Sequence, residues 1–236
     1  MAYDYNGFVS ALASNIVIAV SNTDFLLQLP NFIAEAELRI YRDLDLLSTI
    51  FRDPAGTVVA NQRAYVLPQT YGKFVVVEGV NMFISGVRSL ALTPVSRDYL
   101  DALWPTEAAP TLSATPICFC RDTDTTILIA PSIGASATVS ALEVVGTVRP
   151  AALSASNTTT FISQYLPDLF MAAAMVKASG WMKNYGAQAD DPRQAMSWDT
   201  VYGELLPHAL QEENRKKFAS GSWTAKSPAN SQPERM

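Results

Sequence analysis

The stretch Leu166–Gly186, LPDLFMAAAMVKASGWMKNYG, constrains the fold more than any other part of the chain. Its Pro167-Asp168 pair is typical of a helix start, because proline fits the first turn and a carboxylate favours the positive end of a helix. Between Leu169 and Met182 the only charge is Lys177, so the predicted helix is apolar on almost all sides. Such a helix is expected inside a folded unit. The apolar runs on either side of Lys177 are far shorter than the ~20 residues needed to span a bilayer.

The N-terminal part of the chain is also predicted to be helical. An apolar stripe with helical spacing consists of Phe8, Leu12, Ile16 and Val20. It predicts a helix that reaches about Val20, followed by a short helical piece that stops at Pro30. A further helix is predicted over 31–47, in which Glu35 and Arg39 are spaced for an ion pair one turn apart.

A last helix is predicted after Asp191-Pro192, which repeats the start signal of the central helix. Pro207 is expected to kink or interrupt it. Two ion pairs are expected in its final turns, Glu212 with Lys216 and Glu213 with Lys217. The apolar helix at 166–186 is expected to close a core against helices 31–47 and 191–206.

From about residue 48 to 150 the sequence changes to runs of β-branched and aromatic residues, broken by proline and glycine. Strands are predicted over 48–52, 57–60, 63–67, 74–84, 87–92, 117–121, 126–130 and 137–148. Short connections favour antiparallel pairing. Within this region Asp53–Gly56 is expected to form a turn, Asp122–Asp124 a hairpin connection, and 96–103 a short helix.

The composition limits the possible functions. Hydrophobic residues make up 49% of the chain and charged residues 17%, which is lean in charge for a free monomer and leaves room for large buried interfaces. The net charge of −5 argues against a protein that grips duplex DNA, because that affinity comes from Lys and Arg against phosphates. It remains compatible with a protein that only surrounds DNA.

No group of reactive side chains indicates catalysis or a bound metal. Cys118 and Cys120 are the only cysteines and His208 is the only histidine, so neither a zinc site nor a nucleophile–base pair is indicated. We expect the two cysteines to be small side chains on one face of a strand. The sequence therefore predicts no catalytic residue, no metal and no cofactor.

The two ends of the chain have different compositions. Asp4 stands where a signal peptide would have basic residues, so we expect a soluble chain without a membrane segment. Residues 219–236 are rich in Ser, Pro and Asn, with Trp223 as an aromatic anchor. This composition fits equally a frayed terminus and a peptide that becomes ordered on a partner.

The order of the parts resembles a known family. An AE-x-RI-x-RDL helix, Ala36–Leu44, precedes the β region, which holds the strand and turn ILIAPSIGA, Ile127–Ala135. The helix LPDLFMAAAMVKASGWMKN follows, and then a helix rich in aromatic residues and a polar tail. This arrangement resembles the head–tail connector, or adaptor, proteins of tailed bacteriophages. Ile133 departs from the family pattern, in which a proline is common at that position.

The resemblance implies a ring of copies of this chain, usually twelve, in the neck of the virion beneath the portal protein. Such a ring continues the DNA channel without sequence-specific binding, docks the tail tube or nozzle protein, and touches no membrane. By analogy, residues 219–236 are a portal-binding arm that uses Trp223, Lys226 and Arg235. Contacts between subunits are expected at Arg39, Arg42, Ala174 and Ala178.

The expected fold class is α+β. It comprises an antiparallel helical bundle core over 1–47 and 161–218, an inserted antiparallel β domain over 48–160, and an extended C-terminal arm over 219–236. The expected function is that of a virion structural protein, the head–tail adaptor. Alternatives are a tail-completion or tail-interface protein of different symmetry, a hydrolase that degrades the host envelope, and a ligand-binding β domain on a helical base.

Overall fold

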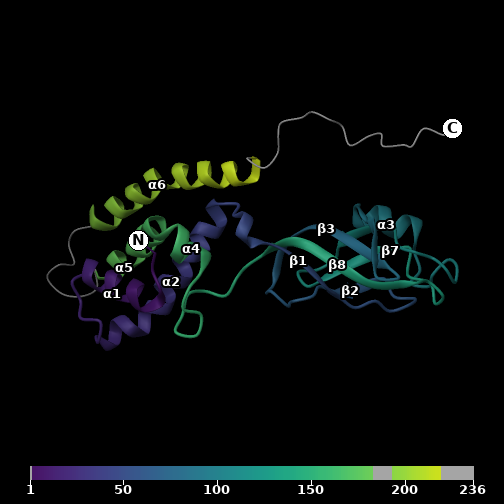
Figure 1. Cartoon of the computed structure of the whole chain (residues 1–236), viewed down its shortest axis with the longest axis horizontal. Coiled ribbons are helices and arrows are strands. Elements are labelled where there is room, and N and C mark those ends of the chain that lie inside the picture. The colour runs from purple at the N-terminus through teal and green to yellow at the C-terminus, as the bar shows by residue number, and fades with distance from the viewer. Residues whose placement is uncertain (1, 183–192, 219–236) are drawn as a thin grey trace. The chain divides into compact units, whose positions relative to one another are not determined.

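The computed structural model of the chain describes residues 2–182 and 193–218 (Figure 1). These residues form two compact units. The first, here called the helical unit, contains the described residues up to Leu47 and from Thr158 onward. The second, the β unit, is Ser48–Asn157. The fold is therefore mixed, with helices and largely antiparallel sheets in the described residues.

Helix α5 is the centre of the helical unit. The helices of this unit are α1 (Tyr5–Asn15), α2 (Thr23–Asp43), α4 (Phe161–Tyr165), α5 (Pro167–Met182) and α6 (Arg193–Phe218). Helix α5 lies between α2 and α6 and makes most of its contacts with them (Figure 1). Its buried side chains come from all around the helix, as expected for a helix without a polar face. The predicted packing of this helix is confirmed.

Helix α2 runs without interruption through Pro30, so the prediction of two separate helical pieces was wrong. Pro30 lies on the exposed side of the helix. A proline inside a helix costs roughly 3 kcal/mol, because a hydrogen bond is lost and its ring crowds the preceding turn. Burial of an apolar face on both sides of Pro30 offsets this cost; that face consists of Phe25, Leu29, Phe32, Ile33, Ala36 and Ile40. Helix α6 likewise continues through Pro207.

Side chains that accept backbone hydrogen bonds set several helix starts. The Asp4 carboxylate accepts the N–H of Gly7 at 2.8 Å and caps α1. Thr160 and Ser163 form a capping box that begins α4, a short helix that the sequence patterns do not predict. Helix α1 ends at Asn15 rather than near Val20. The predicted Asp191-Pro192 start lies outside the described residues.

The β unit is a sandwich of two four-stranded sheets. One sheet has the order β1 (Ile50–Gly56), β8 (Val139–Val148), β3 (Phe74–Ile84) and β4 (Val87–Ala91). The other has the order β2 (Ala64–Val66), β7 (Thr126–Ala130), β6 (Cys118–Arg121) and β5 (Thr93–Pro94). All pairs are antiparallel except β5 with β6. The core between the sheets includes Phe74, Val80, Leu142 and Val144 from one and Tyr65, Phe119 and Ile129 from the other.

The predicted turn at Asp53–Gly56 is wrong, because these residues belong to β1. Strand β1 is at a sheet edge, where proline is tolerated because one side of the strand makes no ladder hydrogen bonds. The pairing with β8 slips between Asp53 and Gly56, which marks a bulge. The buried Asp53 carboxylate accepts the N–H groups of Ala55 at 3.0 Å and Thr70 at 3.1 Å. It therefore fixes the bulge instead of starting a turn.

The two cysteines lie on one face of β6, as predicted. Cys118 and Cys120 are buried against Leu100 of α3 (Arg97–Leu103), while Phe119 between them points into the core of the sandwich. Both are free thiols, and burial raises the pKa of each. They are therefore packing residues. In residues 2–182 and 193–218, no group of three or more potential metal ligands occurs. None of the helices described is both long and apolar enough to cross a membrane.

A candidate docking surface on the helical unit

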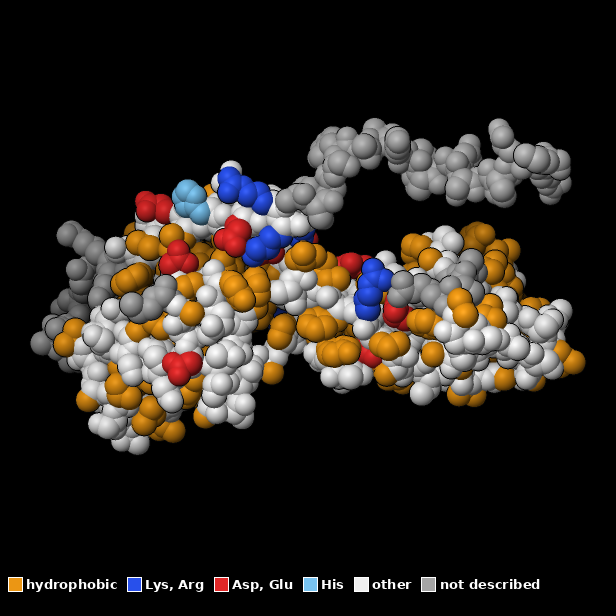
Figure 2. Space-filling view, viewed as in Figure 1, with side chains coloured by type: hydrophobic (Ala, Val, Ile, Leu, Met, Phe, Trp, Pro, Cys, Tyr) orange, Lys and Arg blue, Asp and Glu red, His pale blue; other side chains and the backbone are white. Residues whose placement is uncertain are grey.

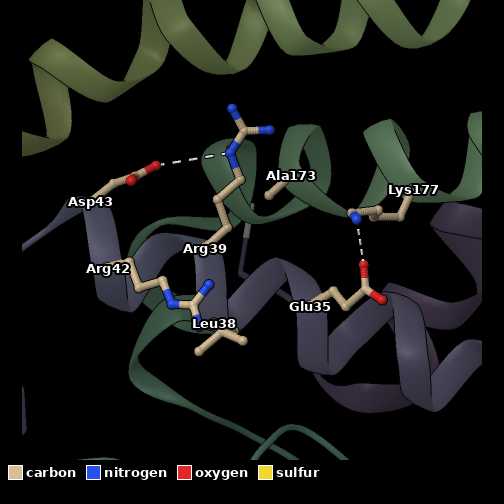
Figure 3. A pocket seen from close by; sticks show the side chains of 7 residues that line it. All are labelled: Glu35, Leu38, Arg39, Arg42, Asp43, Ala173 and Lys177. Atoms are coloured by element: carbon tan, nitrogen blue, oxygen red, sulfur yellow. Dashed lines mark ion pairs between the residues drawn. The ribbon is translucent and has the colours of Figure 1, made fainter.

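Helix α2 presents opposite faces to the core and to the surface. Its buried face packs on α5, as described above. The C-terminal half of its other face is charged and borders a pocket of about 600 Å³. The pocket is lined by Glu35, Leu38, Arg39, Arg42 and Asp43 of α2 and by Ala173 and Lys177 of α5 (Figure 3). We call it the α2–α5 pocket.

Arg39 joins α2 to α6. Its guanidinium group forms an ion pair with Asp199 at 2.7 Å and lies 3.9 Å from the centre of the Tyr202 ring. It also lies 3.8 Å from Asp43, one turn further along α2 (Figure 3). These contacts hold Arg39 in place, so its main role in the described residues is to attach α6 to α2.

Tyr202 completes this attachment. Its side chain is almost fully buried, and its hydroxyl donates a hydrogen bond of 2.7 Å to the Asp43 carboxylate. Burial, followed by this hydrogen bond and the negative charge of Asp43, raises the pKa of Tyr202 well above its usual value. The hydroxyl therefore stays neutral and remains a donor.

Lys177 and Glu35 bridge α5 and α2 at the other end of the pocket. Their side chains form an ion pair of 2.7 Å (Figure 3). Both side chains are about half exposed, so the pair contributes little to stability. The predicted pair of Glu35 with Arg39 is wrong, because each residue has found a partner on another helix.

Arg42 differs from the other charged residues of the pocket. It is exposed and makes no ion pair or hydrogen bond with any residue that the structure describes. Its side chain extends beside the half-buried Leu38 (Figure 3). The lining holds three cations and two carboxylates, so Arg42 supplies an uncompensated positive charge. A guanidinium group beside an apolar side chain suits a carboxylate of another protein.

The structure places the four predicted subunit-contact residues in two different environments. Arg39 and Arg42 line the α2–α5 pocket at the surface. Ala174 and Ala178 are fully buried inside the helical unit, so a neighbouring copy cannot touch them in this arrangement. Their small side chains instead let the helices around α5 approach it closely. The predicted portal-binding residues Trp223, Lys226 and Arg235 lie outside the described residues.

Sequence reasoning missed a second attachment of α6. The Glu213 carboxylate is almost fully buried, accepts the N–H of Leu47 at 3.1 Å, and pairs with Lys216 at 2.7 Å. The predicted pair of Glu212 with Lys216 is confirmed at 3.0 Å. The predicted pair of Glu213 with Lys217 is wrong, because Lys217 pairs with Asp45. A glutamate within a charged run gave no signal that it would be buried.

Comparison with protein families gives one match over nearly the whole chain. The family model described as SU10 adaptor protein matches residues 4–226. The match includes both units and the α2–α5 pocket. A comparison with curated proteins finds no significant match.

Proposed function

We propose, from the premise that the chain belongs to the SU10 adaptor protein family, that it is the head–tail adaptor of a tailed bacteriophage particle. Membership in this family makes it a phage structural protein and implies a non-enzymatic role. The family match over residues 4–226 is the observation that carries the proposal. The chain's lean charge and its surface pocket, in which Arg42 has no partner among the described residues, are consistent with a protein that works through contacts with other proteins.

In the proposed assembly, copies of the chain form a ring beneath the portal in the neck of the virion, with twelve as the expected number. The helical units pack side by side, and the ring extends the DNA channel and docks the tail tube or nozzle. Residues 219–236 bind the portal through Trp223, Lys226 and Arg235. The net charge of −5 supports a channel wall that does not hold DNA. Repetition around the ring multiplies each small contact.

Arg42 is proposed to make one of the contacts between subunits. Its guanidinium group, which has no partner in the part of the chain that the structure describes, would receive a carboxylate from the neighbouring copy. The chain has more acidic residues, 22, than basic ones, 17. Arg42→Glu is expected to abolish ring assembly because it places like charges opposite each other. Arg215→Glu is the matched control, since Arg215 is also exposed and has no described partner. Equal assembly of both variants, measured by native mass spectrometry with purified portal, would contradict this contact.

The function itself is tested by reconstitution with portal complexes and by cryo-electron microscopy of the particle neck. The full chain is expected to form a ring between portal and tail, and counting its subunits separates an adaptor ring from a tail-completion protein of other symmetry. A chain that ends at residue 218 is expected to fold with an unchanged melting temperature but to lose portal binding. Normal portal binding by this truncated chain would refute the arm assignment, and absence of the protein from the neck would refute the function.

A further inference from the structure

Asn6 and Gly7 form the only Asn–Gly pair of the chain, and every other asparagine is followed by a residue with a side chain. Asn6 is exposed, and its side chain makes no hydrogen bond with any residue that the structure describes. Asparagine before glycine is prone to deamidation, because glycine has no Cβ to keep its backbone nitrogen away from the asparagine side chain. Asn6 is therefore the asparagine whose sequence context favours this reaction most.

The reaction is an internal attack that releases ammonia. The backbone nitrogen of Gly7 bonds to the side-chain carbonyl carbon of Asn6, the bond from that carbon to the amide nitrogen breaks, and the Gly7 N–H proton leaves with the ammonia. Water then opens the cyclic imide at either carbonyl, which gives aspartate or isoaspartate. The ring fixes the ψ angle of Asn6 outside the helical range, so the backbone must first leave the helix.

Helix α1 holds Gly7 in a state that prevents this attack. Its N–H donates to the Asp4 carboxylate at 2.8 Å, and Asn6 is the second residue of the helix. A Cβ atom at position 7 would lie 2.7 Å from the same carboxylate, so the glycine that makes Asn6 reactive also gives the cap its room. Asp4 makes no ion pair with a described residue, and away from α6 charged side chains are few on the face of the helical unit that Figure 2 shows.

The segment that carries this cap is fixed on both sides of Asp4. The N–H of Tyr3 donates to the Ser163 carbonyl at 2.9 Å. The N–H of Tyr5 donates to the Thr158 carbonyl, also at 2.9 Å. The side-chain amide of Gln164 donates to the Tyr3 carbonyl at 2.9 Å. The cap can therefore open only when these contacts with the start of α4 loosen.

We infer that Asn6 is a deamidation site, which the Asp4 cap and the anchored N-terminal segment protect in the folded chain. The reaction proceeds only while the first turn of α1 is open, so its rate reports how often that turn opens. Isoaspartate adds a methylene group to the backbone, so the turn cannot close again in the same geometry. Phe8 in that turn stacks on Phe170 of α5, with 4.2 Å between the ring centroids. The cap thus preserves the contact between α1 and α5.

The test follows deamidation in the full chain by peptide mapping with mass spectrometry, and detects isoaspartate with an isoaspartate-specific methyltransferase. In the chain unfolded by urea, Asn6 is expected to react faster than any other asparagine. In the folded chain the reaction at Asn6 is expected to be slower by about tenfold or more, because the first turn must open before the ring can close. Asp4→Ala is expected to accelerate the folded chain about fivefold, which corresponds to the usual contribution of an N-cap.

Asp4→Ser is the matched control, because serine caps a helix about as well as aspartate, and it should keep the wild-type rate. Circular dichroism checks the fold of each variant. If Asp4→Ala is unfolded, Gln164→Ala, which removes one anchor of the N-terminal segment, replaces it in the comparison. Equal rates for folded and unfolded wild type overturn the inference, as does an unfolded chain in which another asparagine reacts first. A folded cap or anchor variant with the wild-type rate, or Asp4→Ser as fast as Asp4→Ala, overturns the protective role of the cap.

Discussion

Tyr202 attaches α6 to α2 across a long sequence separation. Its buried hydroxyl donates to Asp43, and its ring lies against the guanidinium group of Arg39. A buried stripe on the last helix that includes Tyr202 is predicted from the helical spacing of Ala195, Trp198, Val201/Tyr202, Leu205 and Ala209. The pattern could not predict the acceptor, since the spacing of residues along one helix says nothing about a carboxylate on another.

Removing this hydroxyl tests its contribution. We expect Tyr202→Phe to lower the free energy of unfolding by about 1 kcal/mol, because the hydrogen bond from the buried Tyr202 hydroxyl to the partly exposed Asp43 carboxylate is lost. Tyr99→Phe is the control, since Tyr99 is half exposed and its hydroxyl makes no hydrogen bond with any described residue. Urea unfolding of both variants provides the measurement. Equal stability of Tyr202→Phe and the wild type would show that the hydrogen bond contributes nothing net.

The same residue predicts a dependence on alkaline pH. The pKa of Tyr202 is raised in the folded chain, so the unfolded chain loses this proton first as the pH rises. Its contribution to stability is complete below about pH 10, the ordinary tyrosine pKa, and is lost progressively above it. Thermal unfolding should therefore show a steeper alkaline loss for the wild type than for Tyr202→Phe. Parallel curves would contradict the raised pKa.

At the scale of elements, α5 is buried on all sides, whereas α2 has one buried and one exposed side. We expect Ala174→Leu to reduce the free energy of unfolding by about 1–3 kcal/mol, because extra methylene groups at this fully buried position would have to displace packed neighbours. Ala34→Leu on the exposed side of α2 should change it by less than about 0.5 kcal/mol. Thermal unfolding checks both. If Ala174→Leu is as stable as the wild type, the packing around α5 is looser than described.

Sequence patterns predicted the existence of helices and strands better than the residues at which they end or the residues that they contact. Strand β3 has the predicted bounds, since a long run of β-branched residues is decisive. Pro30 led to the wrong prediction of a helix end, because burial of the apolar face of α2 offsets the cost of the proline. The Asp53–Gly56 motif led to the wrong prediction of a turn, because Pro54 lies on an edge strand, where proline is tolerated.

The α2–α5 pocket was not predicted. Two of the residues that line it, Arg39 and Arg42, were expected only as subunit contacts, and that expectation stays a prediction. Partners such as Lys177 and Asp199 lie on other helices and depend on the tertiary packing.

At the scale of the whole molecule, the β unit is one continuous segment with its own core. We expect a fragment of residues 48–157 to fold alone and to unfold cooperatively, because its buried cluster lies between its own two sheets. Circular dichroism during heating, with the full chain for comparison, provides the measurement. A fragment without a cooperative transition would mean that the unit needs the rest of the chain.

The helical unit, in contrast, is assembled from two separated parts of the chain. During translation, α1 and α2 leave the ribosome before the β unit, and their central partner α5 is made only after it. At a translation rate of ~5–20 residues per second, the apolar face of α2 stays uncovered for several seconds before α5 is made. The β unit can complete its fold during this interval and hold the ends of its own segment together, which shortens the loop that α5 must close. This order makes the nascent helices a natural target for chaperones.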